Sequence, residues 1–235
     1  MERIQKVISE SGYTSRRKAE ELIKQGKVYV NGELATLGMK VSYEDDIEVE
    51  GVGIKREEKV YYLLNKPEGY ICSLNDEKNR PIITDLIEEE KRIYPVGRLD
   101  YNTTGVIILT NDGELDNILT HPSFHIEKTY IAKLDKKILT DDIYKLKEGI
   151  VIDGRKCKPT RVKVKSNGKY PSVEISIIEG RNHIVKKVFG ALGYKVIKLH
   201  RSRYGFLTDD IPQGNYRKLT LKEVHKLYAY KVSNQ

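Results

Sequence analysis

YPVGRLDYNTTGVIILTNDG, residues 94–113, is the stretch around which the rest of the chain can be interpreted. It contains the apolar run 106–109, which is bounded at both ends by turn residues and predicts a buried strand. Asp100 lies in the turn-rich segment just ahead of this strand. Charged side chains are rarely placed beside a core element unless they are paired or used in chemistry. Asp100, with Arg98 two residues earlier, therefore forms either a structural ion pair or a reactive carboxylate site.

The residues of this stretch resemble a known catalytic motif. Gly97-Arg98-Leu99-Asp100, followed by Thr103-Thr104-Gly105 and by the run 109–115, is similar to the motif of bacterial pseudouridine synthases of the RsuA/RluB type. Those enzymes modify RNA. The resemblance takes in nearly the whole chain, because it includes the first fifty residues, a Lys-Thr-Tyr motif at 128–130 and a Gly-Arg-Asn-His motif at 180–183.

The resemblance implies four catalytic residues. Asp100 would be the catalytic carboxylate, and Tyr130 would pack against the target base, although strand alternation alone makes Tyr130 a core residue. Lys186 would pair with Asp100 and favour the ionised carboxylate that a nucleophile requires. Leu199 would lie beneath the base. Ile184 stands where the family usually has Gln, a departure that affects a packing or RNA contact and not the charge pairing.

The same resemblance, together with the charge pattern, predicts contacts to RNA. Arg98 would fill the space left by a flipped uridine, and Arg201 and Arg203 would meet phosphates at the rim of the site. The full set of predicted RNA-binding residues is Arg16, Arg17, Lys18, Arg98, Arg181, Arg201 and Arg203.

The charge distribution favours a polyanionic partner. The chain has 235 residues and a formal net charge of +8. Residues 155–203 contain fourteen Lys and Arg against two acids, a local surplus of +12. A solvated basic face is the simpler explanation for scattered lysines, but a concentrated surplus favours nucleic acid, because Lys and Arg release counterions from phosphates. A membrane surface is disfavoured, since no strongly amphipathic basic helix is evident.

The first fifty residues predict a small module of two helices and short strands. Ile4, Val7 and Ile8 share a helical face, Thr14 or Ser15 caps a second helix, and Asn31-Gly32 is a hairpin turn. Three cations, residues 16–18, fall in the first turn of the second helix, where the helix dipole disfavours them unless an anion is bound. The module resembles the S4 RNA-binding domain. Its own net charge is about −2, so any RNA surface is a local basic face.

The remaining sequence predicts an α/β fold in two domains. The expected division is an S4-like domain at 1–50, a linker at 51–59 and a mixed-sheet pseudouridine synthase domain at 60–235, in which strands alternate with helices. Expected strands include 128–134 and 195–201, and a helix is expected from Asn182 or His183 to Gly193.

No metal, cofactor or membrane span is predicted. Cys72 and Cys157 stand far apart without a Cys/His cluster, and no apolar run approaches the ~20 residues that cross a bilayer. The start of the chain lacks the pattern of a secretory signal, so a cytoplasmic, monomeric protein is expected. Its expected partner is ribosomal RNA, most closely 23S rRNA, either free or in a ribosome assembly intermediate.

Alternative functions remain open at this stage. The same reaction on 16S rRNA, or a non-catalytic S4-type RNA-binding protein in ribosome assembly, would also use these motifs. A hydrolase pairing Asp100 with Asp112 or Glu114 is less favoured, because an extended strand would hold these carboxylates about 15 Å or more apart.

Overall fold

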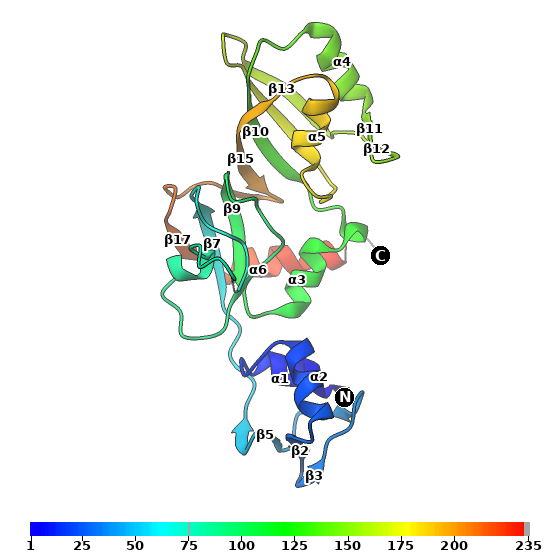
Figure 1. Ribbon diagram of the computed structural model, residues 1–235, viewed down its shortest axis with the longest axis vertical. Helices are drawn as coiled ribbons and strands as arrows, with labels where there is room; N and C mark the ends of the chain where they lie inside the picture. The colour runs from blue at the N-terminus through cyan, green and yellow to red at the C-terminus, as the bar shows by residue number, and fades with distance from the viewer. Residues whose placement is uncertain (75, 233–235) are drawn as a thin grey trace. The chain divides into compact units, whose positions relative to one another are not determined.

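The computed structural model describes residues 1–74 and 76–232 (Figure 1). Its backbone divides into two compact units. The first comprises Met1–Val60 with the short segments Glu89–Ile93 and Asn111–Gly113, and the second comprises Tyr61–Glu88, Tyr94–Thr110 and Glu114–Gln235. Among the described residues, no helix is both long enough and apolar enough to cross a membrane.

The first unit packs two helices against short strands. Its helices are α1 (Ile4–Glu10) and α2 (Arg16–Lys24). Its strands are β1 (Glu2–Arg3), β2 (Val28–Val30), β3 (Glu33–Leu34), β4 (Lys40–Val41), β5 (Ile47–Val49) and β6 (Val52–Ile54). Strands β3, β2, β5 and β6 form one sheet in that order, and β1 pairs with β4. Apolar side chains from both helices and from the sheet share one buried core.

Local sequence signals explain this unit well. The Ser15 side chain accepts a hydrogen bond from the Lys18 backbone N–H and caps α2. Asn31 and Gly32 both have positive φ, 51° and 84°, as the predicted hairpin turn between β2 and β3 requires. The predicted linker at 51–59 is wrong over its first part, because β6 lies within it. Strand β6 pairs with β5 in antiparallel fashion through backbone hydrogen bonds and forms the edge of the sheet.

The second unit is built on a mixed sheet, which confirms the predicted α/β class. Its main path runs β13-β14-β10-β15-β9-β7-β17, with β16 beside β15 and β8 beside β9. The bounds of the inner strands are β7 (Tyr61–Lys66), β9 (Thr103–Thr110), β10 (Lys128–Leu134), β14 (Ser172–Ile177) and β15 (Val196–Tyr204). The outer ones are β8 (Tyr94–Pro95), β13 (Arg161–Ser166), β16 (Leu207–Thr208) and β17 (Tyr216–Lys218). Strands β9 and β15 are parallel, whereas the other pairs in the sheet are antiparallel.

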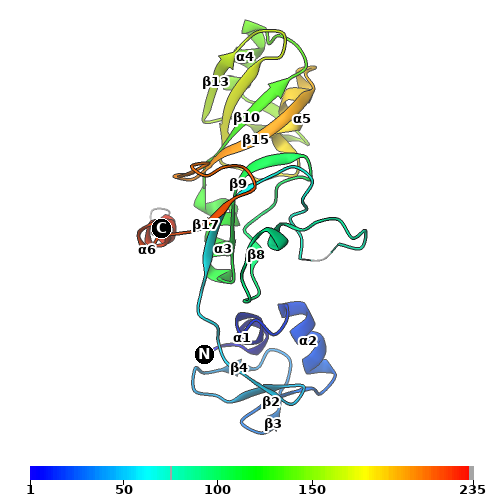
Figure 2. The ribbon, with the colours of Figure 1, turned by 90° about the vertical axis from the view of Figure 1, so that its left-hand side faces the viewer.

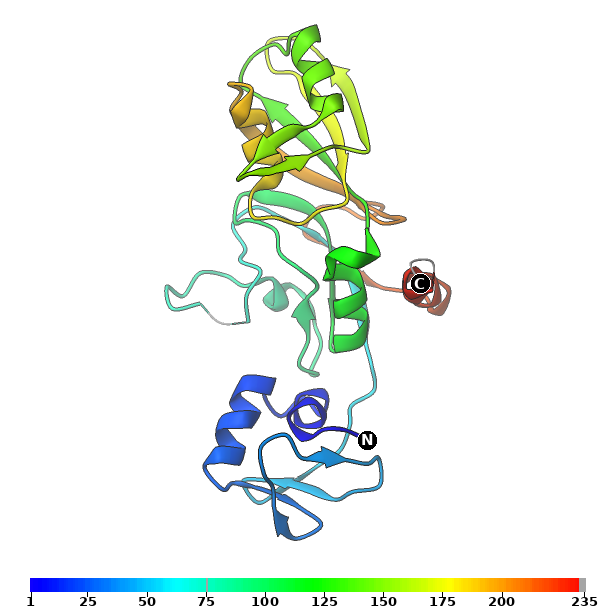
Figure 3. The ribbon, with the colours of Figure 1, turned by 90° about the vertical axis from the view of Figure 1, so that its right-hand side faces the viewer.

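The helices of this unit are α3 (Gly113–Thr120), α4 (Thr140–Glu148), α5 (Ile184–Ala191) and α6 (Leu221–Tyr228), with 3-10 turns at Ile83–Leu86, Pro122–Phe124 and Ala229–Lys231. A hairpin of β11 (Ile150–Ile152) and β12 (Arg155–Cys157) follows α4. Helices α4 and α5 lie on one face of the β13-β14-β10-β15 half of the sheet, as Figure 3 shows. None of the helices in the described part of the chain lies on the opposite face of these strands (Figure 2).

Close contact between β9 and β15 depends on a glycine. Gly105 has a φ of +113°, and a Cβ at this position would lie 2.2 Å from the Arg201 carbonyl oxygen. Any other residue would therefore push the two parallel strands apart. Strand β15 carries residues of the candidate site, and the turn that contains Asp100 leads into β9. Gly105 therefore sets the distance between these two parts of the site.

Candidate active site

A buried lysine, Lys66, fixes the backbone of the turn that carries Asp100. The Lys66 side chain is fully buried, and its Nζ donates to the carbonyl oxygens of Pro67, Asp100, Tyr101 and Thr103 at 3.0, 3.1, 3.3 and 2.9 Å. Burial lowers the pKa of Lys66. The ammonium satisfies carbonyl groups that would otherwise lack partners in the core. It thereby fixes the backbone on both sides of the Asp100 side chain.

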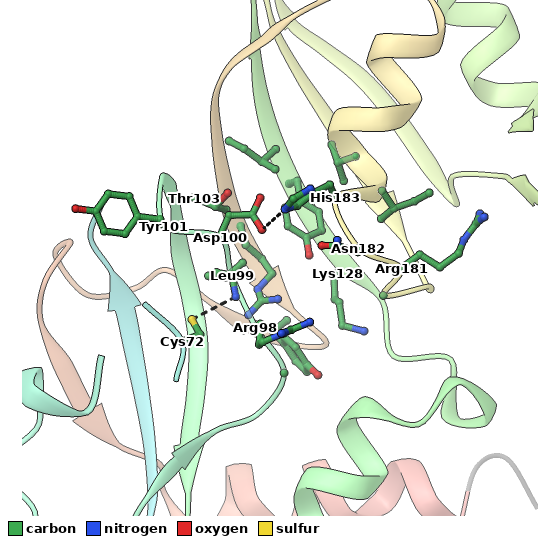
Figure 4. Close-up of a pocket in the computed structure, with 18 of the residues that line it drawn as sticks. Cys72, Arg98, Leu99, Asp100, Tyr101, Thr103, Lys128, Arg181, Asn182 and His183 are labelled. Carbon is green, nitrogen blue, oxygen red and sulfur yellow. Dashed lines mark hydrogen bonds and ion pairs between the residues drawn. The ribbon is translucent and has the colours of Figure 1, made fainter. Parts of the chain in front are cut away.

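The Asp100 carboxylate is bound by two cationic or titratable groups from α5 and its start. Lys186 Nζ lies 2.5 Å from Oδ2. His183 Nε2 lies 3.0 Å from Oδ1 (Figure 4). The carboxylate remains 30% exposed. Both oxygens are therefore oriented, yet the group stays accessible to a reactant. The sequence allowed an ion pair between Asp100 and Arg98. The structure does not contain that pair, because Asp100 contacts Lys186 and His183 instead.

His183 is a site residue that sequence reasoning assigned only to the start of a helix. It is the N-cap of α5 and adopts a left-handed backbone conformation, with a φ of 55°. This conformation is uncommon for a residue other than glycine, and such strain often occurs at functional sites. The Gly-Arg-Asn-His motif at 180–183 was the available signal. The contact with Asp100 depends on tertiary structure, so the sequence alone could not reveal it.

Asp100 faces a cavity of about 630 Å³ that lies within the second unit. Tyr130 and Leu199, both predicted catalytic residues, line this cavity with exposures of 9% and 7%. They come from the adjacent strands β10 and β15, where alternation also buries Ala132 and Leu134 as predicted. The structure thus brings Asp100, Tyr130, Lys186 and Leu199 together. A flat apolar surface next to a carboxylate suits a planar ring of low charge.

Arg98 lies at the open side of the cavity. Its side chain is exposed and lines the pocket, and among the described residues it forms no ion pair or hydrogen bond with another side chain. Leu99, the next residue, is anchored instead, because its backbone N–H donates to Cys72 Sγ at 3.3 Å (Figure 4). Arg98 is therefore a free guanidinium on a fixed backbone, a suitable arrangement for a side chain that must move.

Arg201 departs from its predicted position. The rim location is wrong, because Arg201 is only 2% exposed and its Nε donates to the Val106 carbonyl oxygen at 2.7 Å. Its register opposite Tyr130 turns the side chain toward the cavity side of the sheet. The Nη2 atom is buried and lacks a hydrogen-bond partner. The guanidinium packs over the Tyr204 ring, 4.9 Å from the centroid.

Lys128 is a second buried cation in the cavity that sequence reasoning did not select. It lines the pocket beside Arg201, and its Nζ lies 5.2 Å from the centroid of Tyr204. Burial, aided by the Arg201 guanidinium, lowers the pKa of Lys128 to about 8. The floor of the cavity therefore carries a second positive charge, beside that of Arg201, only below that pH.

This pKa makes the activity pH-dependent. We expect kcat/KM for RNA to fall about fivefold between pH 8 and 9, because the protonated fraction of Lys128 in the free enzyme falls from about one half to about one tenth. Lys128→Arg, which stays charged, should remove that fall. The depressed pKa means that folding stability from this group rises over the same range, so unfolding would not explain the loss. An unchanged profile in Lys128→Arg would contradict the assignment, and steady-state kinetics at fixed salt would measure it.

The other predicted RNA-binding residues lie in different environments. Arg203 is exposed but does not line the cavity, because a β-bulge at Ser202 interrupts the alternation along β15 and directs Arg203 to the opposite face of the sheet; its predicted rim position is wrong. Arg181 lies at the rim, where its guanidinium is bound to Glu179 and to the Ile152 carbonyl oxygen. That pairing raises the pKa of Arg181. In the first unit, residues 16–18 are exposed on the first turn of α2, and Lys18 pairs with Glu21 at 2.8 Å.

Neither partner considered for a glycosidase reaches the cavity. Asp112 is 1% exposed and pairs with Lys59 at 3.0 Å, and Glu114 pairs with Lys231 at 2.8 Å. Neither lines the pocket, and β9 runs extended from Thr103 to Thr110 between them and Asp100. A two-carboxylate hydrolase is therefore not supported. Within the described residues, no group of three or more His, Cys, Asp or Glu side chains could hold a metal ion.

Comparison with known proteins adds independent evidence. Residues 60–191 match the family model described as RNA pseudouridylate synthase, and residues 2–47 match the S4 domain. The chain is 47% identical to the ribosomal large subunit pseudouridine synthase B of Bacillus subtilis (strain 168), over 97% of this chain and 96% of that protein. It is 36% identical to the ribosomal small subunit pseudouridine synthase A of Haemophilus influenzae, over 96% and 99%.

A solved structure agrees with these matches. A crystal structure of a pseudouridylate synthase superposes with a TM-score of 0.69 at 36% identity, covering 97% of this chain and 100% of that one. The whole chain, including both units, is thus shared with these relatives. A single carboxylate oriented by Lys186 and His183, beside a pocket that Tyr130 and Leu199 line, is consistent with an isomerase that needs one acidic group. Its motifs, its fold and these matches together place the chain in the RNA pseudouridylate synthase family, with an S4 domain ahead of the catalytic domain.

Proposed function

We propose that this RNA pseudouridine synthase acts on a single uridine of 23S rRNA, with Asp100 as its catalytic carboxylate. The observation that carries the proposal is the Asp100 carboxylate, held by Lys186 and His183 at the mouth of a pocket lined by Tyr130 and Leu199. The partner is ribosomal RNA, either free or in an assembly intermediate, met by a monomer in the cytoplasm. The start of the catalytic domain at residue 60 is part of this proposal.

The proposed reaction rearranges bonds within one nucleotide. The bond between the sugar C1′ and the base N1 breaks, the uracil turns while held, and C1′ joins C5. C5 loses a proton and N1 gains one, so the product is an isomer. Asp100 would attack the sugar or the base, or assist elimination from the sugar. The ammonium of Lys186 and the ring of His183 keep the carboxylate aimed, while Tyr130 and Leu199 would enclose the turning base.

The target uridine must leave its stack to reach Asp100. Extruding a base costs a few kcal/mol, which contacts to the flanking RNA offset. Arg98 is free, exposed and beside the pocket, so it would occupy the vacated space. The cationic floor of Lys128 and Arg201 would hold a phosphate or a carbonyl group of the nucleotide.

The proposed preference for 23S over 16S rRNA is supported by the sequence identities of the chain to its relatives. The chain is more similar to the large-subunit enzyme of Bacillus subtilis, at 47% identity, than to the small-subunit enzyme of Haemophilus influenzae, at 36%. Both relatives are matched over nearly their full length. Action on 16S rRNA is therefore the second candidate.

Arg98→Ala should separate base flipping from chemistry. We expect turnover on a structured RNA hairpin to fall about tenfold or more, whereas turnover on a single strand with an exposed uridine should change little. The reason is that an exposed uridine leaves no gap in a base stack, so no side chain has to occupy its former position. Single-turnover rates on the two RNAs would measure the difference, with Arg80→Ala, another arginine lining the pocket, as a matched control. Equal losses on both substrates would contradict the role.

The proposal is tested by locating the product. Wild-type protein is incubated with unmodified 16S and 23S transcripts, and pseudouridine is mapped by nucleotide. Product at one position of the 23S transcript is the expected result. Product only in the 16S transcript would overturn the substrate assignment. Binding without product, on both transcripts and on partly assembled subunits, would favour an RNA-binding assembly protein instead.

A further inference from the structure

The sheet face opposite the cavity is strongly basic. Because residues alternate between the two faces of a strand, the neighbours of the cavity-lining residues point the other way. We call these positions the outer face. It consists of Arg161 and Lys163 on β13, Ser172, Glu174 and Ser176 on β14, Thr129, Ile131 and Lys133 on β10, and Lys198, His200 and Arg203 on β15.

The strand register arranges the cations of the outer face in rows. Arg161 and Arg203 lie at the two ends of one row, with Ser176 and Thr129 between them. The hydroxyl groups of that Ser and Thr are hydrogen-bonded at 2.9 Å, and both residues are buried between the flanking side chains. Four residues along β10, about 13 Å from that row, Lys133 and Lys198 face each other directly. The cations are therefore spread over the whole width of four strands.

The charges on this face are largely uncompensated. Five of its eleven positions carry Lys or Arg, all exposed, and Glu174 is its one acid; all eleven lie in the described part of the chain. Glu174 lies 3.7 Å from Arg161 and 3.5 Å from Lys165, which adds a sixth cation at the edge. Lys198 has only a distant partner, Glu68 at 3.9 Å.

Within the described part of the second unit, no helix covers the outer face, and the segment after β16 touches it where Asp209 pairs with His200 at 2.7 Å. Helices α4 and α5 pack on the other side of these strands, and the outer side is open to the viewer in Figure 2. An exposed tyrosine, Tyr170, borders the face, with its ring centroid 5.5 Å from Lys133 Nζ. A flat aromatic ring beside lysines is a feature of surfaces that bind single-stranded nucleic acid, because any base can stack on it.

The geometry points to the outer face as a second RNA-binding surface, which holds a segment of the RNA other than the one that enters the cavity. The inference rests on the proposed function, since it takes the partner to be a large RNA. Clustered, exposed and poorly paired cations repel one another, and a phosphate backbone relieves that repulsion while releasing its own counterions. The surplus of positive charge in residues 155–203 is thereby divided between two faces of one sheet.

Neutralising this face tests the inference. The variant combines Lys133→Gln, Lys163→Gln and Lys198→Gln, which keep side-chain length and remove three charges. Its matched control, Lys137→Gln, Lys147→Gln and Lys222→Gln, removes three exposed charges outside the outer face. Affinity for the 23S transcript is measured over a series of KCl concentrations. A short stem–loop that carries only the modified uridine serves as a second RNA.

The expected result concerns the long RNA only. For the outer-face variant, the slope of log affinity against log salt should become shallower by about 2, and Kd at moderate salt should rise about tenfold. The control variant and the short stem–loop should show no such change, and kcat at saturating stem–loop should stay at the wild-type value. Equal effects of the two variants, no effect, or an equal loss on the stem–loop would each overturn the inference. Product mapping with wild-type protein tests the proposed function separately, because affinity does not depend on turnover.

Discussion

Replacing Asp100 with Asn should lower pseudouridine formation by about 10³-fold or more, while the affinity for RNA stays within about threefold. Asn keeps the shape of the side chain and can still accept a hydrogen bond from Lys186. It lacks the negative charge and the nucleophilic oxygen pair that the reaction requires. Single-turnover assays on the 23S transcript, with binding measured in parallel, would separate loss of chemistry from loss of binding.

A matched control is available for this substitution. Asp153→Asn also removes one carboxylate that is paired with a lysine of α5, because Asp153 contacts Lys187 at 2.6 Å. Its side chain is 63% exposed and does not line the cavity, so we expect wild-type activity. Appreciable product from Asp100→Asn would remove Asp100 from the mechanism. It would then favour another group of the cavity as the reactive one.

Much of the fold follows from local sequence signals. The apolar run 106–109 is the centre of β9, and the segment expected as a strand at 128–134 is β10 with the same bounds. These predictions succeed because buried strands need long apolar or alternating patterns that few other structures tolerate. Helix α6 was also open to prediction, since Thr220 and Glu223 form a capping box at its start.

Other features depend on contacts that no local pattern encodes. Lys66 looks like a turn residue in the sequence, yet it is fully buried because its ammonium donates to the carbonyl group of Pro67 and to three carbonyl groups of the distant segment 100–103. Arg201 is drawn into the sheet in the same way by the Val106 carbonyl oxygen. A cation is ordinarily predicted at the surface. Only the tertiary structure shows the oxygen atoms whose hydrogen bonds offset the desolvation cost of burying it.

The candidate site was predictable to a similar extent. The motifs identify Asp100 and Tyr130, and family likeness identifies Lys186, because each stands in a short ordered pattern. The roles of His183 and Lys128 were not evident, since they arise from side chains that meet across β10, α5 and the turn before β9. Whether each of these residues acts in the reaction stays a prediction that the proposed variants test.

Lys186→Met should reduce kcat by about 10²- to 10³-fold, with a smaller change in the affinity for RNA. Met fills a similar volume but leaves one oxygen of Asp100 without its charged donor, so the carboxylate loses both orientation and electrostatic support. Lys186→Arg should restore part of the activity, because a guanidinium can supply the same charge. Single-turnover rates at saturating RNA give the kcat effect, and binding assays give the affinity.

The neighbouring residue makes this prediction specific. Lys187→Met removes the same charge from the same helix, but Lys187 pairs with Asp153 and not with Asp100. Its activity should stay within about twofold of wild type, because exposed ion pairs contribute little. Similar losses in both variants would show that α5 needs its charges for folding or for general RNA affinity. A loss confined to Lys186→Met would instead connect the rate directly to the donor on Asp100, since the two lysines differ mainly in which carboxylate they contact.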